Sequence, residues 1–183
     1  FHGRSRGRAR RPSHARPRML QGARDAMDDT DVLAPGHAMK LGIEGLAAHC
    51  LEAVLPEFAA QVRAGDVIVA GPNFGIGSSR EQAAQVLVHL GVKAVIAPSF
   101  GGLYFRNAFN VGLLALTCPQ AHLLQNQDQL ALDLPGQELV LTDGRHIACE
   151  PIAPFLLDMV HAGGLLPHLK RRLQTRNPQV ETP

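Results

Sequence analysis

Residues 66–97 read DVIVAGPNFGIGSSREQAAQVLVHLGVKAVIA, and this stretch decides the fold. Residues 66–70 and 93–97 are short, apolar runs rich in β-branched side chains, as is typical of strands buried on both faces of a sheet. Apolar residues at helical spacing lie between these runs and predict a helix that starts at Ser79 and ends at Gly91. We therefore expect a strand, a helix and a second strand joined as a right-handed parallel crossover.

The segments after this crossover extend the same architecture. Residues 104–110 indicate another helix, which leads to a third strand at residues 113–117. From residue 129 the period changes to alternating leucines separated by Pro-Gly and Asp-Gly turns, which favours an antiparallel meander. The sequence therefore predicts an α/β fold made of a parallel crossover and an antiparallel meander.

The ends of the folded unit are marked by composition. Before residue 66 we expect a turn or strand end at residues 32–34, a helix at 45–52 and a short turn at 56–62. Residues 154–166 predict a helix broken at a Gly-Gly pair, followed by a basic, polar stretch. We predict a disordered tail at residues 1–24, one domain at 25–172 and a polar tail at 173–183.

The charge is unevenly distributed. Eight of the 18 basic residues are arginines at or before Arg24, where there is no acid, so the remaining chain has 10 basic and 16 acidic residues and a net charge of −6. An acidic body argues against a nucleic-acid binder, since phosphate contacts need basic side chains. The arginine-rich tail leaves an RNA-binding arm or a transit peptide open as alternatives.

The cysteines indicate no metal centre on this chain. Cys50, Cys118 and Cys149 are far apart and odd in number, so neither a disulfide framework nor a zinc or iron–sulfur ligand set is present. We interpret them as buried thiols in a reducing, cytoplasmic compartment. No run approaches the roughly 20 apolar residues of a membrane span, so we expect a soluble protein.

The loop between the first strand and the helix carries the candidate chemistry. It follows the carboxyl end of a parallel strand, where open α/β sheets bind ligands. Helix N-termini attract anions, and Gly75 and Gly77 allow close approach to the backbone. Arg80 can hold a carboxylate with two hydrogen bonds. Ser78 is a candidate base, because a helix N-terminus beside this guanidinium would stabilise the alkoxide form of its side chain.

Other uses of this loop are less consistent with its residues. It has no Gly-Lys-Ser/Thr ending, no third glycine of the dinucleotide fingerprint and no nucleophile elbow. An organic carboxylate bound by Arg80 is the ligand that remains. The structural alternative is that Ser78 and Glu81 form a capping box and that Arg80 is solvated.

Several motifs resemble the small subunit of 3-isopropylmalate dehydratase, a family that corresponds to the swivelling domain of aconitases. The resemblance runs from about Asp29 to Lys170. It is carried by the following segments: Asp29-Thr30-Asp31, His49-Cys50, Gly71 to Glu81, Val95 to Phe100 and Ala162 to Leu166.

This resemblance implies a swivelling β/β/α domain and a hydro-lyase of malate-type dicarboxylic acids, with 2-isopropylmalate in leucine biosynthesis as the first expectation. Related acids are dimethylmalate, citramalate and homoaconitate. It also implies a separate large subunit that holds a [4Fe–4S] cluster, with no cofactor bound by this chain. By position, Ser78 takes the proton from carbon, Asp31 positions the acid–base groups, and Arg80 binds the carboxylate with support from Ser79.

The sequence departs from the family pattern at several places, and the loop after Pro35 leaves the substrate open. Ile76 stands where relatives often have Cys, and Gln82 where they commonly have His. The loop after Pro35, which reads the variable substituent in this family, contains Lys40, which we expect to meet a carboxylate or to be solvated. The arginine-rich start also stands where relatives have an apolar first strand, so we expect that this strand is missing or replaced or that a partner covers the gap. A carboxylate-binding module without catalysis is the competing interpretation.

Overall fold

The structure, a computed structural model, describes residues 30–77, 80–125 and 128–176. The predictions for the basic tail at residues 1–24 and for a replaced first strand fall outside these residues. Strands β1 (Val67–Val69), β2 (Ala94–Ala97) and β3 (Leu114–Thr117) form a parallel sheet in the order β1-β2-β3. All three are almost fully buried, because continuous apolar strands can be covered on both faces.

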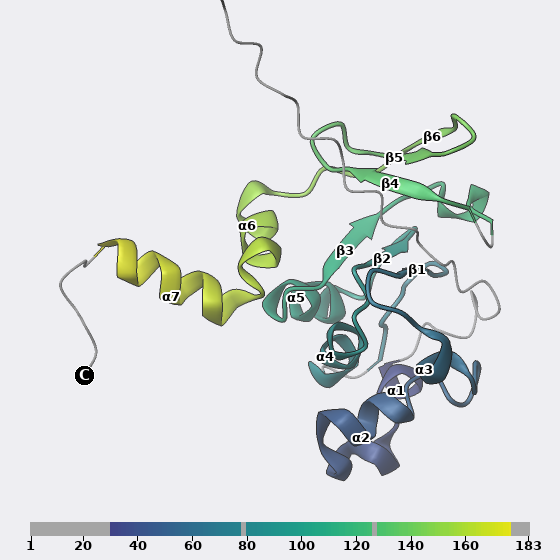
Figure 1. Cartoon of the computed structure of the whole chain (residues 1–183), viewed down its shortest axis with the longest axis vertical. Helices are drawn as coiled ribbons and strands as arrows, with labels where there is room; N and C mark the ends of the chain where they lie inside the picture. The colour runs from purple at the N-terminus through teal and green to yellow at the C-terminus, as the bar shows by residue number, and fades with distance from the viewer. Residues whose placement is uncertain (1–29, 78–79, 126–127, 177–183) are drawn as a thin grey trace, which may run out of the picture.

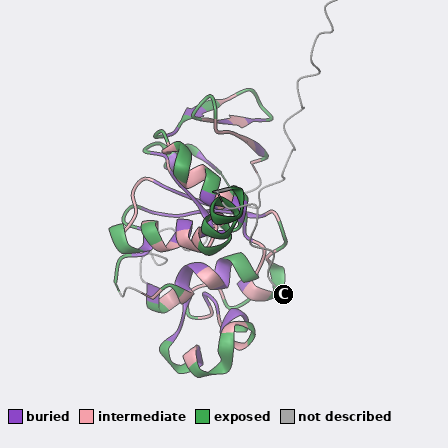
Figure 2. Cartoon of the chain, turned by 90° about the vertical axis from the view of Figure 1, so that its left-hand side faces the viewer, coloured by how far each residue is buried: buried purple, intermediate pink, exposed green. Residues whose placement is uncertain are grey.

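Two helices connect these strands. Helix α4 (Gln82–His89) joins β1 to β2, and α5 (Gly102–Asn110) joins β2 to β3. The helices pack against one another, and α5 also packs on β3 and on α6 (Pro154–Ala162). Figure 1 shows them grouped beside the sheet, and Figure 2 shows that each has a buried and an exposed face. The predicted parallel crossover is therefore confirmed.

A separate layer is formed by the predicted meander. Strands β4 (Leu130–Asp133), β5 (Glu138–Leu141) and β6 (His146–Ala148) pair antiparallel in chain order. A backbone hydrogen bond of 2.8 Å from Glu150 N to the Thr117 carbonyl oxygen ties its end to the end of β3, where the two layers meet (Figure 1). The fold class predicted from the sequence is thus confirmed.

Short helices precede the sheet. They are α1 (Thr30–Leu33), a 3-10 helix η2 (Gly36–Leu41), α2 (Gly42–Ala48) and α3 (Phe58–Gln61), and a further 3-10 helix, η3 (Ala121–Leu123), follows β3. The prediction of a turn or strand end at residues 32–34 is wrong, because α1 packs onto α4 and buries Leu33 fully. Tertiary packing of this kind routinely overrides a weak local signal.

The C-terminal helix also differs from the prediction. Helix α7 (Leu165–Arg176) continues past residue 173, where the polar tail was predicted to start. It projects from the body and is largely exposed, as Figures 1 and 2 show. Among the described residues, no helix is long and apolar enough to cross a membrane.

Candidate active site

The loop after β1 is anchored to the segment after β2. Asn73 N–H donates to Ser99 Oγ at 2.8 Å, and Phe74 N–H donates to the Ser99 carbonyl oxygen at 3.0 Å. Gly101 N–H donates a hydrogen bond of 2.9 Å to the Phe74 carbonyl oxygen. Asn73 has a φ of 61°, a conformation that a short polar side chain tolerates better than most. The loop is therefore fixed at the carboxyl edge of the parallel sheet, as predicted.

Gly75 is required by the packing beneath the loop. Its φ is 77°, and a Cβ at this position would lie 2.2 Å from Cγ of Tyr104. The Tyr104 ring is 1% exposed and lies between Phe74, at a centroid distance of 5.1 Å, and Phe100, at 6.4 Å. The sequence predicted that Gly75 permits a ligand to approach; the structure adds a close contact with an aromatic ring, which no local motif indicates.

Asp31 and Arg80 lie together although 49 residues separate them. Arg80 Nη1 donates to Asp31 Oδ1 and, at 3.3 Å, to the carbonyl oxygen of Ala34. A hydrogen bond of 3.2 Å from Thr30 N–H to the Ile76 carbonyl oxygen holds α1 beside the loop. Both Arg80 contacts use Nη1, so neither engages the edge formed by Nε and Nη2. Arg80 is therefore ion-paired with Asp31 instead of being merely solvated, and the capping part of that alternative stays a prediction.

The helix after the loop starts later than predicted. Helix α4 begins at Gln82, with Glu81 as its N-cap residue and no side-chain capping bond there. The predicted start at Ser79 is therefore wrong, and Arg80 precedes the helix instead of lying in its first turn. Ser78 and Ser79 lie outside the described residues, so their predicted roles and the capping box stay predictions.

The remaining predicted residues that the structure describes lie in the loop after β1 and on η2. Gly77, with a φ of 123°, continues the loop from the exposed Ile76. Lys40 lies exposed on η2, which follows α1 through Pro35. The structure thus brings Asp31, Arg80 and the glycine loop together, and it places Lys40 on a neighbouring surface segment.

Two buried groups near the loop are held in their protonated forms. Burial raises the pKa of the Tyr104 hydroxyl and of the Cys50 thiol well above their usual ranges, so both stay protonated at neutral pH. All three cysteines are free and buried, which confirms their interpretation as core thiols.

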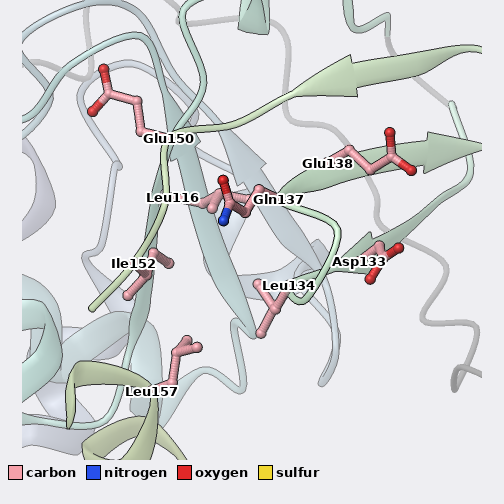
Figure 3. A pocket seen from close by; sticks show the side chains of 8 residues that line it. All are labelled: Leu116, Asp133, Leu134, Gln137, Glu138, Glu150, Ile152 and Leu157. Atoms are coloured by element: carbon pink, nitrogen blue, oxygen red, sulfur yellow. The ribbon is translucent and has the colours of Figure 1, made fainter. Parts of the chain in front are cut away.

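A hollow elsewhere in the molecule does not fit a dicarboxylate. It lies between the meander, β3 and α6, and Figure 3 shows carboxylates of Asp133, Glu138 and Glu150 around it. Its cavity of about 10 Å³ holds little more than a single water molecule. Because these side chains would also repel an anionic substrate, the loop after β1 is the better candidate.

The parallel sheet, the glycine loop at its carboxyl edge and the Asp31–Arg80 pair define an α/β domain with a guanidinium oriented beside that edge. Residues 34–121 match the aconitase C-terminal domain family. The chain is 42% identical over 149 residues to the methanogen homoaconitase small subunit of Methanothermobacter thermautotrophicus, covering 80% of this chain and 86% of that one. It is 40% identical over 150 residues to the 3-isopropylmalate dehydratase small subunit of Moorella thermoacetica, covering 80% and 90%.

A solved structure agrees with these matches. The crystal structure of 3-isopropylmalate dehydratase from Methanocaldococcus jannaschii superimposes with a TM-score of 0.77 at 38% identity, covering 82% of this chain and 91% of that chain. The chain belongs to the aconitase-related family of 3-isopropylmalate dehydratase and homoaconitase small subunits. The resemblance predicted from the motifs is therefore confirmed.

Proposed function

We propose that this chain is the small subunit of a heteromeric hydro-lyase that converts 2-isopropylmalate into 3-isopropylmalate in leucine biosynthesis. The observation that carries the proposal is the Asp31–Arg80 ion pair beside the glycine loop, in a chain of this family. The carboxyl edge of a parallel sheet with an oriented guanidinium is suited to hold a carboxylate.

In this proposal each residue of the loop has a separate task. Asp31 fixes one end of the Arg80 guanidinium through Nη1, and the Nε and Nη2 edge makes the bidentate contact with a substrate carboxylate. Ser79 supports this carboxylate, and Gly75 and Gly77 let it approach the backbone. Ser78, ionised to an alkoxide that the guanidinium two residues away stabilises, accepts the proton removed from carbon and becomes a neutral hydroxyl.

The metal chemistry is assigned to a partner. A large subunit would hold a [4Fe–4S] cluster, which supplies a Lewis acid for the departing hydroxyl. The burial of all three cysteines of this chain fits a cluster held elsewhere, since thiols enclosed in a core cannot reach one. Free thiols also suit a cytoplasmic location, where they stay reduced.

Homoaconitate is the competing substrate, favoured by the 42% identity with a methanogen homoaconitase small subunit. Lys40 is exposed on η2 and would meet the additional carboxylate of such an acid. The test is to combine this chain with its cluster-loaded large subunit and to follow the absorbance of the unsaturated intermediate acid. Isopropylmalate should give the highest kcat/KM among isopropylmalate, dimethylmalate, citramalate and homoaconitate. A higher kcat/KM for homoaconitate would make homoaconitate the substrate in place of isopropylmalate. No turnover on any of these acids would contradict the proposal that the chain is an enzyme subunit.

A carboxylate-binding module without catalysis is the second function, favoured by Ile76 and Gln82 in place of a thiol and an imidazole. Calorimetry of the isolated chain with malate-type diacids separates the two. The hydro-lyase subunit should bind these acids weakly, because it supplies only half of the site. Tight binding without a partner would favour the module.

Arg80→Lys should lower kcat/KM of the reconstituted enzyme by about 10- to 100-fold, mainly through KM, because lysine loses the planar pair of donors. Steady-state kinetics measures this change. Arg63→Lys is the matched control, since Arg63 lies exposed before β1, and it should keep the wild-type value. Equal kcat/KM for Arg80→Lys and Arg63→Lys would contradict the role of Arg80.

A further inference from the structure

Three side chains with metal-binding atoms converge away from the loop after β1. Glu52 Oε1 lies 3.0 Å from His37 Nε2, and Glu52 Oε2 lies 2.6 Å from His49 Nδ1. The ligand atoms of the three residues all lie within 4.8 Å of one another. The two imidazole rings have centroids 5.3 Å apart and meet edge to face at 79°. One carboxylate is therefore placed between two ring nitrogens.

Separate backbone elements position these residues. His37 lies on η2, His49 is the C-cap residue of α2, and Glu52 lies in the turn that follows. Leu51 holds this turn in place: its side chain is fully buried, its φ is 61°, and its N–H donates to the Val32 carbonyl oxygen at 3.0 Å. A non-glycine residue adopts such a backbone only where its surroundings fix it. His49 and Glu52 are thus held on a firm scaffold, whereas His37 approaches from a different segment.

The chemistry of this cluster selects the kind of ion. Two imidazole nitrogens and one carboxylate oxygen suit zinc and related first-row divalent metals, whereas magnesium and calcium prefer sites made of oxygen. Bonds of about 2.0–2.2 Å to zinc set tetrahedral ligand atoms about 3.3 Å apart. The two histidine–glutamate contacts, at 2.6 and 3.0 Å, are slightly shorter than this spacing. The bound of 4.8 Å on the separations among all the ligand atoms is longer than this spacing. Rotation of His37, whose side chain is 64% exposed, adjusts the separations that involve His37, and a turn of the Glu52 carboxylate lengthens its 2.6 Å contact with His49.

We propose that His37, His49 and Glu52 bind a divalent cation of the zinc type, with solvent completing its coordination. The cysteines of the sequence predicted that this chain carries no metal. The proposed site departs from that prediction and uses no cysteine. A bound ion ties η2, which carries Lys40, to the end of α2 and so fixes a surface loop through two histidines and one carboxylate. The proposal stands apart from the proposed enzymatic function, because it depends only on ligand atoms of this chain.

Calorimetry with Zn²⁺ and visible absorption with Co²⁺, on the purified full chain stripped of metal, test the site. We expect one specific site in the wild-type chain and a loss of affinity of at least about 10-fold in His37→Gln and Glu52→Gln. Zn²⁺ should also raise the thermal midpoint of the wild-type chain but not of these variants. The exposure of His37 makes His37→Gln safe for folding.

The matched control is His146→Gln. His146 Nδ1 also lies 3.0 Å from a glutamate oxygen, in Glu138 on the neighbouring strand, but this pair is not part of the three-ligand group. The control should keep wild-type affinity for Zn²⁺. It also keeps any background Zn²⁺ binding by His2 and His14 in the basic tail. The absence of a specific Zn²⁺ site in the wild-type chain would overturn the proposal. So would an unchanged affinity in His37→Gln, or an equal loss in His146→Gln.

Discussion

Ser78→Ala should lower kcat of the reconstituted enzyme by a factor of about 10²–10⁴ with little change in KM, because it removes the group proposed to accept the proton. The oriented guanidinium of Arg80 would remain to bind the substrate carboxylate, since its contacts with Asp31 and Ala34 do not involve Ser78. Steady-state kinetics on isopropylmalate measures both constants.

Ser79→Ala separates catalysis from binding at the adjacent position. This variant removes the same hydroxyl group one residue later and should raise KM while largely preserving kcat, because Ser79 is proposed to support the bound carboxylate. A wild-type kcat in Ser78→Ala would contradict the proposal that Ser78 is the base. The reverse pattern, with kcat lost only in Ser79→Ala, would assign the proton transfer to the neighbouring serine.

Gly75→Ala should lower the free energy of unfolding by about 2–5 kcal/mol, the sum of the cost of a left-handed backbone at a residue with a Cβ and the cost of overpacking. The new Cβ would lie 2.2–2.6 Å from three atoms of Tyr104. This ring cannot withdraw easily, because Phe74 packs on its edge and Phe100 stacks parallel to it. Urea unfolding followed by circular dichroism measures the change.

Gly102→Ala is the matched control. Gly102 begins α5, a Cβ at this residue would meet nothing within 4 Å, and its φ is not left-handed, so its replacement should be neutral or slightly stabilising. Tyr104 is the only tyrosine and the chain has no tryptophan, so intrinsic emission reports on this packing directly. Wild-type stability and emission in Gly75→Ala would contradict the packing account.

Much of the fold could be predicted because its main layers have strong periodic signals. The apolar strands β1 and β2 and the alternating leucines of the meander each bury a face that the sequence displays. Helix α1 could not be predicted in this way. It is four residues long and is stabilised by its contact with α4, a helix that lies far along the chain.

The candidate site could be predicted in its residue types but not in its contacts. The glycine loop and Arg80 indicated an anion site through local chemistry. The pairing of Asp31 with Arg80 and the contact of Gly75 with Tyr104 depend on long-range packing, which leaves no local pattern. The helix start was misplaced because the Ser78–Glu81 spacing matched a capping box, whereas the first turn of α4 begins after Glu81. The His37–His49–Glu52 cluster was also missed, because its members come from different elements.

The central claim is that this chain supplies the substrate-holding half of a site that a cluster-bearing subunit completes. The most direct measurement is the rate of formation of the unsaturated acid by each subunit alone and by the mixture. The account predicts turnover only in the mixture, saturating when this chain equals the large subunit in amount and falling in Ser78→Ala. Turnover by the large subunit alone at the rate of the mixture, or none in the mixture with an intact cluster, would contradict it.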